Sequence, residues 1–446
     1  MAVPEAAETA AASMSDAEHR MQLRRALIAS TVGTTIEWYD FLLYGTVSAL
    51  VFGPLFFPQS DPLMGVLQSF GVFFIGFVGR PIGAAIFGHW GDRIGRKATL
   101  IATLLLTGIA TTAVGLVPTY DQVGMWGAVI LTLLRLIQGI GVGGEWGGSV
   151  LLAMEWARSN KNRGFLSAWP QFGAPCGLFL ANTAVLGFSY LSGDQFNVWG
   201  WRIPFLISIV MVVIGMWIRL GIAETPVFRR VVAEDRVERV PVLEVLRRQP
   251  KQVILSALLR LPEQGPGFIV GTFIFTYATT VLGQTRNFVL MAVITQTVIG
   301  FLWVVCAGAL SDYIGRKNMY MIGAAFMGIF GFIYFAMLNT GIPWIIFVAI
   351  AISLVPVMTQ YGPEAALIAE SFSPRLRYSG TSIGYQLASI IAGGPAPIIA
   401  TWLFATFHSS LPIAIYISLL AIVGIIATAL LTDYTGKDIS AEYAGV

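Results

Sequence analysis

The sequence predicts an all-α integral membrane protein whose twelve transmembrane helices form two pseudo-symmetric bundles of six. Of its 446 residues, 56% are hydrophobic and 11% are charged, with a mean hydropathy of +0.74, whereas soluble proteins carry about 25% charged residues. Apolar runs of about 20 residues, long enough to cross a bilayer as helices, recur along the chain. A short charged motif also occurs twice, once in each half.

The apolar runs define twelve spans when each span is required to contain about 20 mostly apolar residues, the length of a membrane helix. In chain order we expect them near residues 26–50, 65–90, 98–117, 124–155, 164–190, 200–221, 252–282, 288–311, 319–338, 343–370, 379–407 and 411–432. The longest polar connection contains Pro226, Pro241 and Pro250 and is expected to form short amphipathic surface helices. The predicted parts are therefore a tail at 1–25, a bundle at 26–221, a loop at 222–251, a bundle at 252–432 and a tail at 433–446.

The basic residues predict the orientation, because Lys and Arg concentrate in cytoplasmic loops. They precede span one and follow spans two, four, six, eight, ten and twelve, whereas the opposite side has only Arg202 and Arg286. Both termini are therefore expected in the cytoplasm of a bacterium, with the chain passing repeatedly through the plasma (inner) membrane. The first 20 residues lack an apolar run before their charges, so they predict a disordered tail and no signal peptide.

Several classes of protein are disfavoured. A formal net charge of +3 is too small to suggest nucleic-acid binding. Cys176 and Cys306 lie in apolar stretches, and His19, His89 and His408 have no metal-ligand spacing. No nucleophile elbow, P-loop or zinc-protease motif is present. We therefore expect no enzyme activity, no cofactor, no metal and no nucleic-acid partner.

The repeated motif follows span two and span eight. Residues 92–97 read DRIGRK and residues 312–317 read DYIGRK, so five of six positions match. Duplicated halves are expected of transporters that rock two bundles around a central site.

These segments resemble those of a known family. Residues 88–97 (GHWGDRIGRK) and 135–141 (RLIQGIG) look like the loop and fourth-helix signatures of the major facilitator superfamily. The resemblance narrows to its metabolite:proton symporter family, closest to shikimate and α-ketoglutarate-type permeases, through residues 37–41 (EWYDF), 79–83 (GRPIG), 143–148 (GGEWGG) and 199–205 (WGWRIPF). It implies the major facilitator fold, a proton-coupling role for Arg135 and a monomer.

Ionisable residues at mid-membrane are costly unless they are paired or hydrated, so each is a functional candidate. Glu37 and Asp40 lie three residues apart on one face of span one, and such neighbouring carboxylates suit a proton carrier. The alternative is that one of them is structural, held by an arginine or by backbone amides. Arg80 and Arg135 are expected at similar depth in the membrane, and each can bind a carboxylate through two hydrogen bonds. For Arg80, a fixed pairing with Glu37 or Asp40 is as good an interpretation as a substrate contact.

Span seven holds Arg260 and Glu263 at i and i+3, which predicts a local ion pair. Prolines and glycines within 262–267 predict a kinked or partly unwound helix, and such helices commonly line substrate cavities. Tyr361 and Glu364 in span ten are further candidates for the cavity wall. The expected substrate-binding residues are Tyr39, Tyr44, Arg80, Arg135, Gln138, Gln171, Arg260, Glu263, Gln360, Tyr385 and Gln386.

The repeated loops have a different expected role, because in the superfamily such loops pair across the halves and close the cytoplasmic side. Glu155 and Glu370 are the natural partners of Arg96 and Arg316. The alternative is that these cations only set the topology. The expected gate residues are Asp92, Arg93, Arg96, Lys97, Glu155, Asp312, Arg316, Lys317 and Glu370.

Taken together, these features predict a secondary active transporter that works by alternating access. It would import a small carboxylated metabolite, either an organic acid or a zwitterion, together with protons. The first alternative is a proton-driven exporter of the same fold. The second is an osmosensing or receptor-like carrier, which short tails without a signalling domain disfavour.

Overall fold

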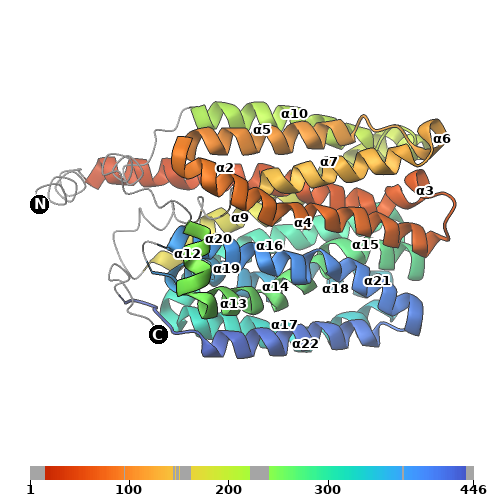
Figure 1. The fold of residues 1–446 in the computed structure, drawn as a ribbon. Helices are drawn as coiled ribbons and strands as arrows, with labels where there is room; N and C mark the ends of the chain where they lie inside the picture. The colour runs from red at the N-terminus through yellow and green to blue at the C-terminus, as the bar shows by residue number, and fades with distance from the viewer. Residues whose placement is uncertain are drawn as a thin grey trace, which may run out of the picture.

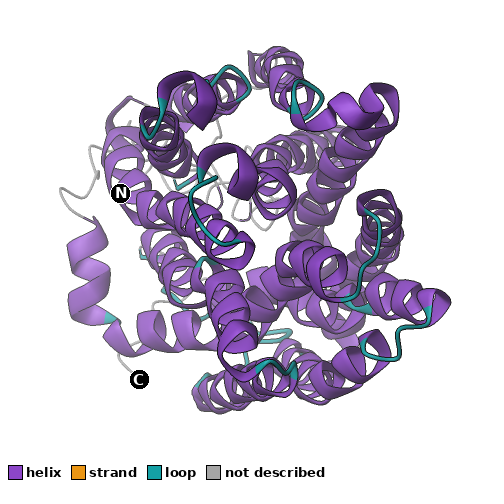
Figure 2. Ribbon diagram, turned by 90° about the vertical axis from the view of Figure 1, so that its right-hand side faces the viewer, coloured by secondary structure: helices purple, strands orange, loops and turns teal. Residues whose placement is uncertain are grey.

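The computed structural model describes residues 16–94, 96–143, 146, 150, 162–220, 241–373 and 376–437. Within these ranges every regular element is a helix and none is a strand (Figure 2). Nine of the described helices are long and apolar enough to cross a membrane, and two shorter apolar helices accompany them. The predicted all-α membrane fold is thus confirmed.

The helices match the predicted spans in order. The first six spans correspond to α2 (Asp16–Val47) continued by η1 (Ser48–Phe52) and α3 (Gly53–Phe56), then α4 (Pro62–Ile94), α5 (Arg96–Val114), α7 (Trp126–Val142), α9 (Arg163–Ser192) and α10 (Arg202–Leu220). Short α6 (Tyr120–Val123) and η2 (Gly193–Asn197) connect them. We call residues 16–220 the first half.

The second half, residues 241–437, begins with the short helix α12 (Pro241–Arg248). Its spans are α13 (Pro250–Leu259), α14 (Leu261–Phe268), η3 (Ile269–Phe273), α15 (Ile274–Thr276) and η4 (Tyr277–Val281), then α16 (Arg286–Ile314), α17 (Arg316–Leu338), α18 (Pro343–Ile352) with α19 (Leu354–Glu370), α20 (Arg377–Ala388) with η5 (Ser389–Gly393) and α21 (Pro395–Phe407), and α22 (Leu411–Leu430). The connection before α12 lies outside the described residues.

The seventh span is broken, as its prolines and glycines predict. The α-helix stops at Leu259, resumes at Leu261 and then alternates with the π-helical turns η3 and η4. Pro262 and Pro266 lie within α14 and have no backbone N–H to donate, which weakens the hydrogen bonding of the helix around them. π-helical turns are rare and occur frequently at functional sites.

The long helices run side by side along one direction, with α5, α7 and α10 at one edge of the molecule and α17 and α22 at the other (Figure 1). Helix α9 packs against both α2 and α16, so it joins the halves. The end at which α9 begins and α22 stops carries Arg163, Arg316 and Lys437, and we call it the basic end. The opposite end, near Phe196 and Arg286, is the far end.

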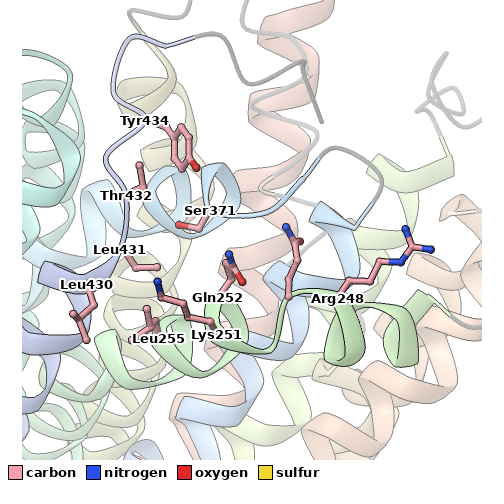
Figure 3. Close-up of a pocket in the computed structure, with 10 residues that line it drawn as sticks. Arg248, Lys251, Gln252, Leu255, Ser371, Leu430, Leu431, Thr432 and Tyr434 are labelled. Carbon is pink, nitrogen blue, oxygen red and sulfur yellow. The ribbon is translucent and has the colours of Figure 1, made fainter. Parts of the chain in front are cut away.

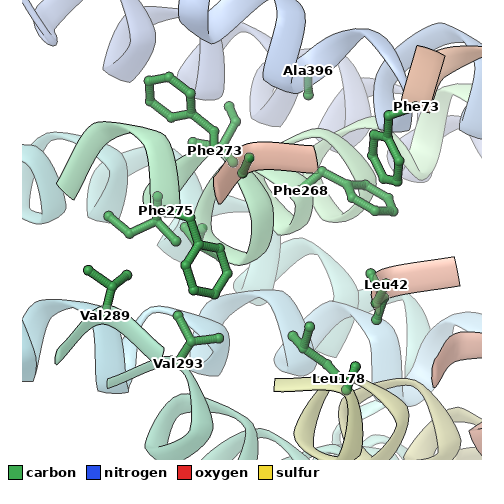
Figure 4. Packing of buried hydrophobic residues seen from close by; sticks show 14 of the residues in the cluster. Leu42, Phe73, Leu178, Phe268, Phe273, Phe275, Val289, Val293 and Ala396 are labelled. Atoms are coloured by element: carbon green, nitrogen blue, oxygen red, sulfur yellow. The ribbon is translucent and has the colours of Figure 1, made fainter. Parts of the chain in front are cut away.

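Aromatic side chains pack the halves together at mid-height. Phe268 of α14 lies against two rings of α4, with centroids 5.8 Å from Phe73 and 5.1 Å from Phe77. Figure 4 shows Leu42, Leu178 and Phe268, from three separate segments, around the same space. The buried polar residues described next are set into this apolar surrounding.

Candidate functional site

Two buried arginines of the first half lie against one aromatic ring. Helices α4 and α7 approach closely, because a Cβ added to Gly139 would overlap the backbone of Gly76. This brings the Cζ atoms of Arg80 and Arg135 to 3.9 and 3.8 Å from the ring centroid of Phe41 on α2. A desolvated cation–π contact contributes about 2 kcal/mol, so the ring replaces part of the lost hydration of both cations.

Some N–H groups of these two guanidinium groups have no hydrogen-bond acceptor among the described residues. Arg135 donates from Nε to the Phe73 carbonyl at 3.4 Å and from Nη1 to Gln138 Oε1. Its Nη2, and Nε and Nη2 of Arg80, are buried with no acceptor among the described residues. An unsatisfied buried donor costs about 1–3 kcal/mol, and more when it is charged. Both arginines therefore keep buried, positively charged donors without an acceptor among the described residues.

Asp40 faces the interior of the first half. Its Oδ1 accepts a hydrogen bond from Ser208 Oγ of α10 at 2.7 Å, and its Oδ2 is buried without a donor among the described residues. The carboxylate of Glu37 is also buried, and its charge attracts Arg80. Glu37 and Asp40 are the two expected partners of Arg80, and only Glu37 has an electrostatic interaction with it.

The other predicted first-half residues hold helices together. Tyr39 donates from its hydroxyl to the Pro204 carbonyl at 2.8 Å. Gln138 donates from Nε2 to the Asp40 carbonyl at 3.0 Å and also accepts from Arg135. The Tyr44 ring lies 4.5 Å from Arg135 Cζ, and its buried hydroxyl has no partner among the described residues.

A buried ion cluster occupies the break in the seventh span. Arg260 binds Glu364 Oε1 through Nε at 2.6 Å and Glu263 Oε2 through Nη2 at 3.1 Å, and its Nη1 donates to the Tyr385 carbonyl at 2.7 Å. The predicted i, i+3 pair is therefore formed. The sequence predicts Glu364 only as part of the cavity wall, because its partner Arg260 lies on another span. The one local sign of a role for Glu364 is that a carboxylate occurs inside an apolar run.

The Tyr385 ring lies between Arg260 and the first half. Arg260 Cζ is 3.4 Å from its centroid, and the Trp146 ring stacks on it with centroids 3.6 Å apart and planes at 22°. Because both distances are so short, Arg260 and Trp146 lie on opposite faces of the Tyr385 ring. Trp146 Nε1 in turn donates to Gln171 Oε1 at 3.0 Å. This stack joins the ion cluster of the second half to Trp146 and Gln171 of the first half.

Other predicted polar residues also bridge the halves or brace the second one. Gln171 donates from Nε2 to the Tyr361 carbonyl at 3.3 Å, and Gln386 donates from Nε2 to the Gly143 carbonyl at 3.4 Å. Both bonds cross between the halves. Gln360 instead donates to the Pro262 carbonyl at 3.3 Å, inside the second half.

A cavity lies between the halves. Its walls come from α2 and α9 on one side and from α14, η3 and α19 on the other, and they are mostly apolar. Glu263 and Tyr361 contribute polar groups, and Trp38 contributes an aromatic ring. Arg80 lies behind Trp38, with its Cζ 5.6 Å from the Trp38 ring centroid. The two charged clusters therefore approach one mostly apolar chamber.

At the basic end, the carboxylate of Asp312 on α16 is hydrogen-bonded to the first turn of α9. Its two carboxylate oxygens each accept a backbone N–H, from Gly164 and from Phe165, both at 2.9 Å. These N–H groups open a helix and have no intrahelical acceptor, so a carboxylate there is favourable. Asp312 also binds Arg316 Nη2 at 2.9 Å. The contact joins the first half to the second.

Glu370 forms the centre of the same network. It binds Arg316 Nη1 at 2.5 Å, as predicted, and lies 3.1 Å from Arg163 Nε of the first half. The local sequence does not indicate this partner for Arg163, because Glu370 is distant along the chain. Lys317 donates to the carbonyls of Ala429 and Leu431, so it braces the second half. Among the predicted gate residues, Glu155 lies outside the described residues, and the structure describes only the backbone of Asp92, Arg93, Arg96 and Lys97.

The halves also touch at the far end, through hydrogen bonds to uncharged acceptors. Arg286 donates from Nε to Ser189 Oγ at 3.0 Å, and Ser189 Oγ donates to Asn287 Oδ1 at 2.6 Å. The Arg286 guanidinium also lies 4.1 Å from the Phe196 ring centroid. In the described part of the chain, the two halves therefore touch at both ends of their interface.

The chain matches two family models, the sugar (and other) transporter family over residues 25–253 and the MFS/sugar transport protein family over residues 148–407. It is 40% identical over 417 residues to the inner membrane metabolite transport protein YhjE of Escherichia coli, covering 92% of this chain and 94% of that one. It is 38% identical over 418 residues to the shikimate transporter of the same organism, with the same coverage. Among solved structures, the proton:xylose symporter XylE has a TM-score of 0.73 at 20% identity, over 95% of this chain and 98% of that one.

The family models, the curated relatives and the helical fold agree. The chain therefore belongs to the major facilitator superfamily, within its sugar and other transporter family, and is a multi-pass membrane protein that acts as a secondary transporter of small molecules.

Proposed function

We propose that this protein imports a small carboxylated metabolite together with protons. The observation that carries the proposal is the pair of buried arginines, Arg80 and Arg135, whose N–H groups lack acceptors behind the cavity wall. A substrate carboxylate that reached them would satisfy those donors and neutralise buried charge. The likeness to a transporter named for shikimate, a carboxylic acid, supports this substrate class.

Transport would proceed by alternating access. The cavity between the halves is the substrate chamber, and the contacts at the basic end and the far end are the two gates that open in turn. We propose that the basic end faces the cytoplasm of the inner membrane, because its arginines and lysines follow the positive-inside pattern. Opening inward then requires Asp312 and Glu370 to release Gly164, Phe165 and Arg163.

Two buried acidic pairs are placed to carry the proton. The charge of Glu37 attracts Arg80, and Asp40, three residues further along α2, has one oxygen with no donor among the described residues. Glu263 and Glu364 share the single cation Arg260 in the second half. We assign proton coupling to Glu37 and Asp40 with Arg135, because a substrate anion bound at Arg80 would act directly on Glu37, and Asp40 lies one turn away on the same helix.

The direct test is uptake into proteoliposomes with an imposed inward proton gradient. The labelled solutes are shikimate, α-ketoglutarate, citrate, simple monocarboxylates and proline betaine. We expect one of the carboxylates to accumulate above equilibrium only while the gradient persists. Transport that requires a reversed gradient would instead establish an exporter.

Asp40→Asn and Glu37→Gln are expected to abolish accumulation against a gradient while solute exchange continues. The substitutions remove the proton carriers and leave both arginines in place. Uphill uptake and counterflow exchange, measured on the same proteoliposomes, separate the two activities. Asp194→Asn is the matched control, because Asp194 is an exposed acid at the far end. Full uphill uptake in both test variants would contradict the assignment.

Asp312→Asn is expected to open the basic end. The change removes a charge that accepts from two N–H groups of α9 and pairs with Arg316. The reporter is Ala369→Cys in a background lacking Cys176 and Cys306, since Ala369 is buried beside Trp146 at the interface. A membrane-impermeant maleimide should label it several times faster in the Asp312→Asn variant.

Asp433→Asn serves as the control for the gate. Asp433 lies at the same end, but its carboxylate accepts from Thr435 within the second half. Equal labelling rates in the reporter with and without Asp312→Asn would show that this carboxylate does not hold the gate shut.

A further inference from the structure

A second pocket opens at the basic end, outside the transport chamber. It lies where α12 turns into α13, beside the last turn of α22 (Figure 3). Arg248, Lys251 and Gln252 lie on one side of it, with Thr432 and Tyr434 on the other. The segments that form it all belong to the second half, so it is separate from the interface that opens and closes.

The pocket is positively charged. Arg248 and Lys251 both line it, and none of the described residues that line it is acidic. Arg248 uses Nε to bind Glu244 at 2.5 Å, but its side chain is 70% exposed. Lys251 is exposed and forms no ion pair with any residue in the described ranges. Two cations are thus presented in one concave, polar site.

The backbone adds a donor at the same place. Helix α13 begins at Pro250, so the first-turn N–H group of Lys251 has no intrahelical acceptor. Such N–H groups favour a phosphate or another anion. The side chains of Lys251 and Gln252 line the pocket themselves, so charge and helix terminus converge on one point.

Apolar side chains place the pocket mouth at the surface of the bilayer. Helix α12 buries Val245 but leaves Leu243 and Leu246 more than two-fifths exposed, as a helix lying in the membrane interface does. Leu430, in the pocket wall, and Ile254, one turn into α13, are also largely exposed. A ligand held here would have its anion among the cations and its remainder beside lipid.

We propose that this pocket binds the phosphate of an anionic phospholipid from the leaflet at the basic end. Basic pockets between membrane helices on the cytoplasmic side bind such headgroups. A bound lipid would connect α12 and α13 to the end of α22 and so stabilise the second half. The inference does not depend on the identity of the transported solute.

The test measures thermal unfolding of the full-length protein in a neutral detergent as phosphatidylglycerol is added. We expect the lipid to raise the unfolding temperature of the wild type, and Arg248→Gln with Lys251→Gln to weaken its apparent affinity about thirty-fold, at roughly a factor of five per cation. Arg24→Gln with Arg25→Gln is the matched control, because it removes two exposed cations elsewhere at the basic end.

Further arms distinguish the source of the phosphate. Phosphatidylcholine and inorganic phosphate should give no comparable shift. A shift with inorganic phosphate alone would assign the pocket to a soluble anion, and an equal loss in the Arg24/Arg25 variant would reduce the effect to general surface charge. Either result overturns the proposal. The proposal is also overturned if phosphatidylglycerol does not raise the unfolding temperature of the wild type. If the glutamine variant does not fold, Arg248→Lys with Lys251→Arg must still respond to the lipid.

Discussion

Arg260→Met is expected to lower the free energy of unfolding by about 3–5 kcal/mol, because Glu263 and Glu364 would then remain buried without a cation. The stacked Tyr385 ring would also lose its charged neighbour. The measurement is unfolding of the purified protein by SDS titration in mixed micelles. The loss should exceed that of any exposed ion pair in the molecule.

Two variants make this expectation specific. Arg248→Met breaks an exposed i, i+4 pair with Glu244 and should cost less than about 1 kcal/mol. Combining Arg260→Met with Glu263→Gln and Glu364→Gln removes the whole charge cluster and should restore much of the stability. If Arg260→Met unfolds at the same SDS fraction as the wild type, the cluster does not hold the broken seventh span.

Arg80→Lys is expected to weaken substrate binding about thirty-fold, which corresponds to about 2 kcal/mol, the contribution of one hydrogen bond to a charged group. A lysine has neither the planar fork that binds a carboxylate bidentately nor the face that lies on Phe41. Binding is measured at equilibrium, without a proton gradient, using the solute that accumulates in proteoliposomes. Counterflow exchange should fall with it.

The control is Arg202→Lys, which keeps a charge at the far end. Arg202 donates to the carbonyls of Gly115 and Val117 and lies against Trp201, so it is held by the scaffold. Its substitution should leave solute affinity within a factor of about two, since no carboxylate is expected there. Unchanged affinity in Arg80→Lys would place the substrate carboxylate elsewhere, with Arg135 the next candidate.

The predicted bundle boundaries and the assigned roles of the site residues stay predictions until these experiments are done. The geometry nevertheless separates two groups among them. Glu263 lines the cavity, Tyr385 and Gln171 contact the other half, and Arg80 lies against Trp38 of the cavity wall. Tyr39, Gln138 and Gln360 bond to backbone carbonyls within one half, and their loss should affect stability more than solute recognition.

The sequence by itself determined the membrane fold, the order of the helices and the break in the seventh span. A bilayer requires long apolar helices, and Pro262 and Pro266 remove backbone donors wherever they occur, so these features depend on neighbouring residues alone. The pairing of Arg260 with Glu263 is local for the same reason, since residues three apart share a helix face.

Only the tertiary structure decided which distant groups meet. It brought Glu364 to Arg260, Trp146 to Tyr385 and the start of α9 to Asp312. It also placed two arginines against Phe41, an apolar residue that no charge pattern indicates. Each contact joins separate helices whose rotation and spacing depend on how small residues such as Gly76 and Gly139 let them approach. Periodicity along one helix shows which face is apolar but not which neighbour covers it, so these partners followed from packing.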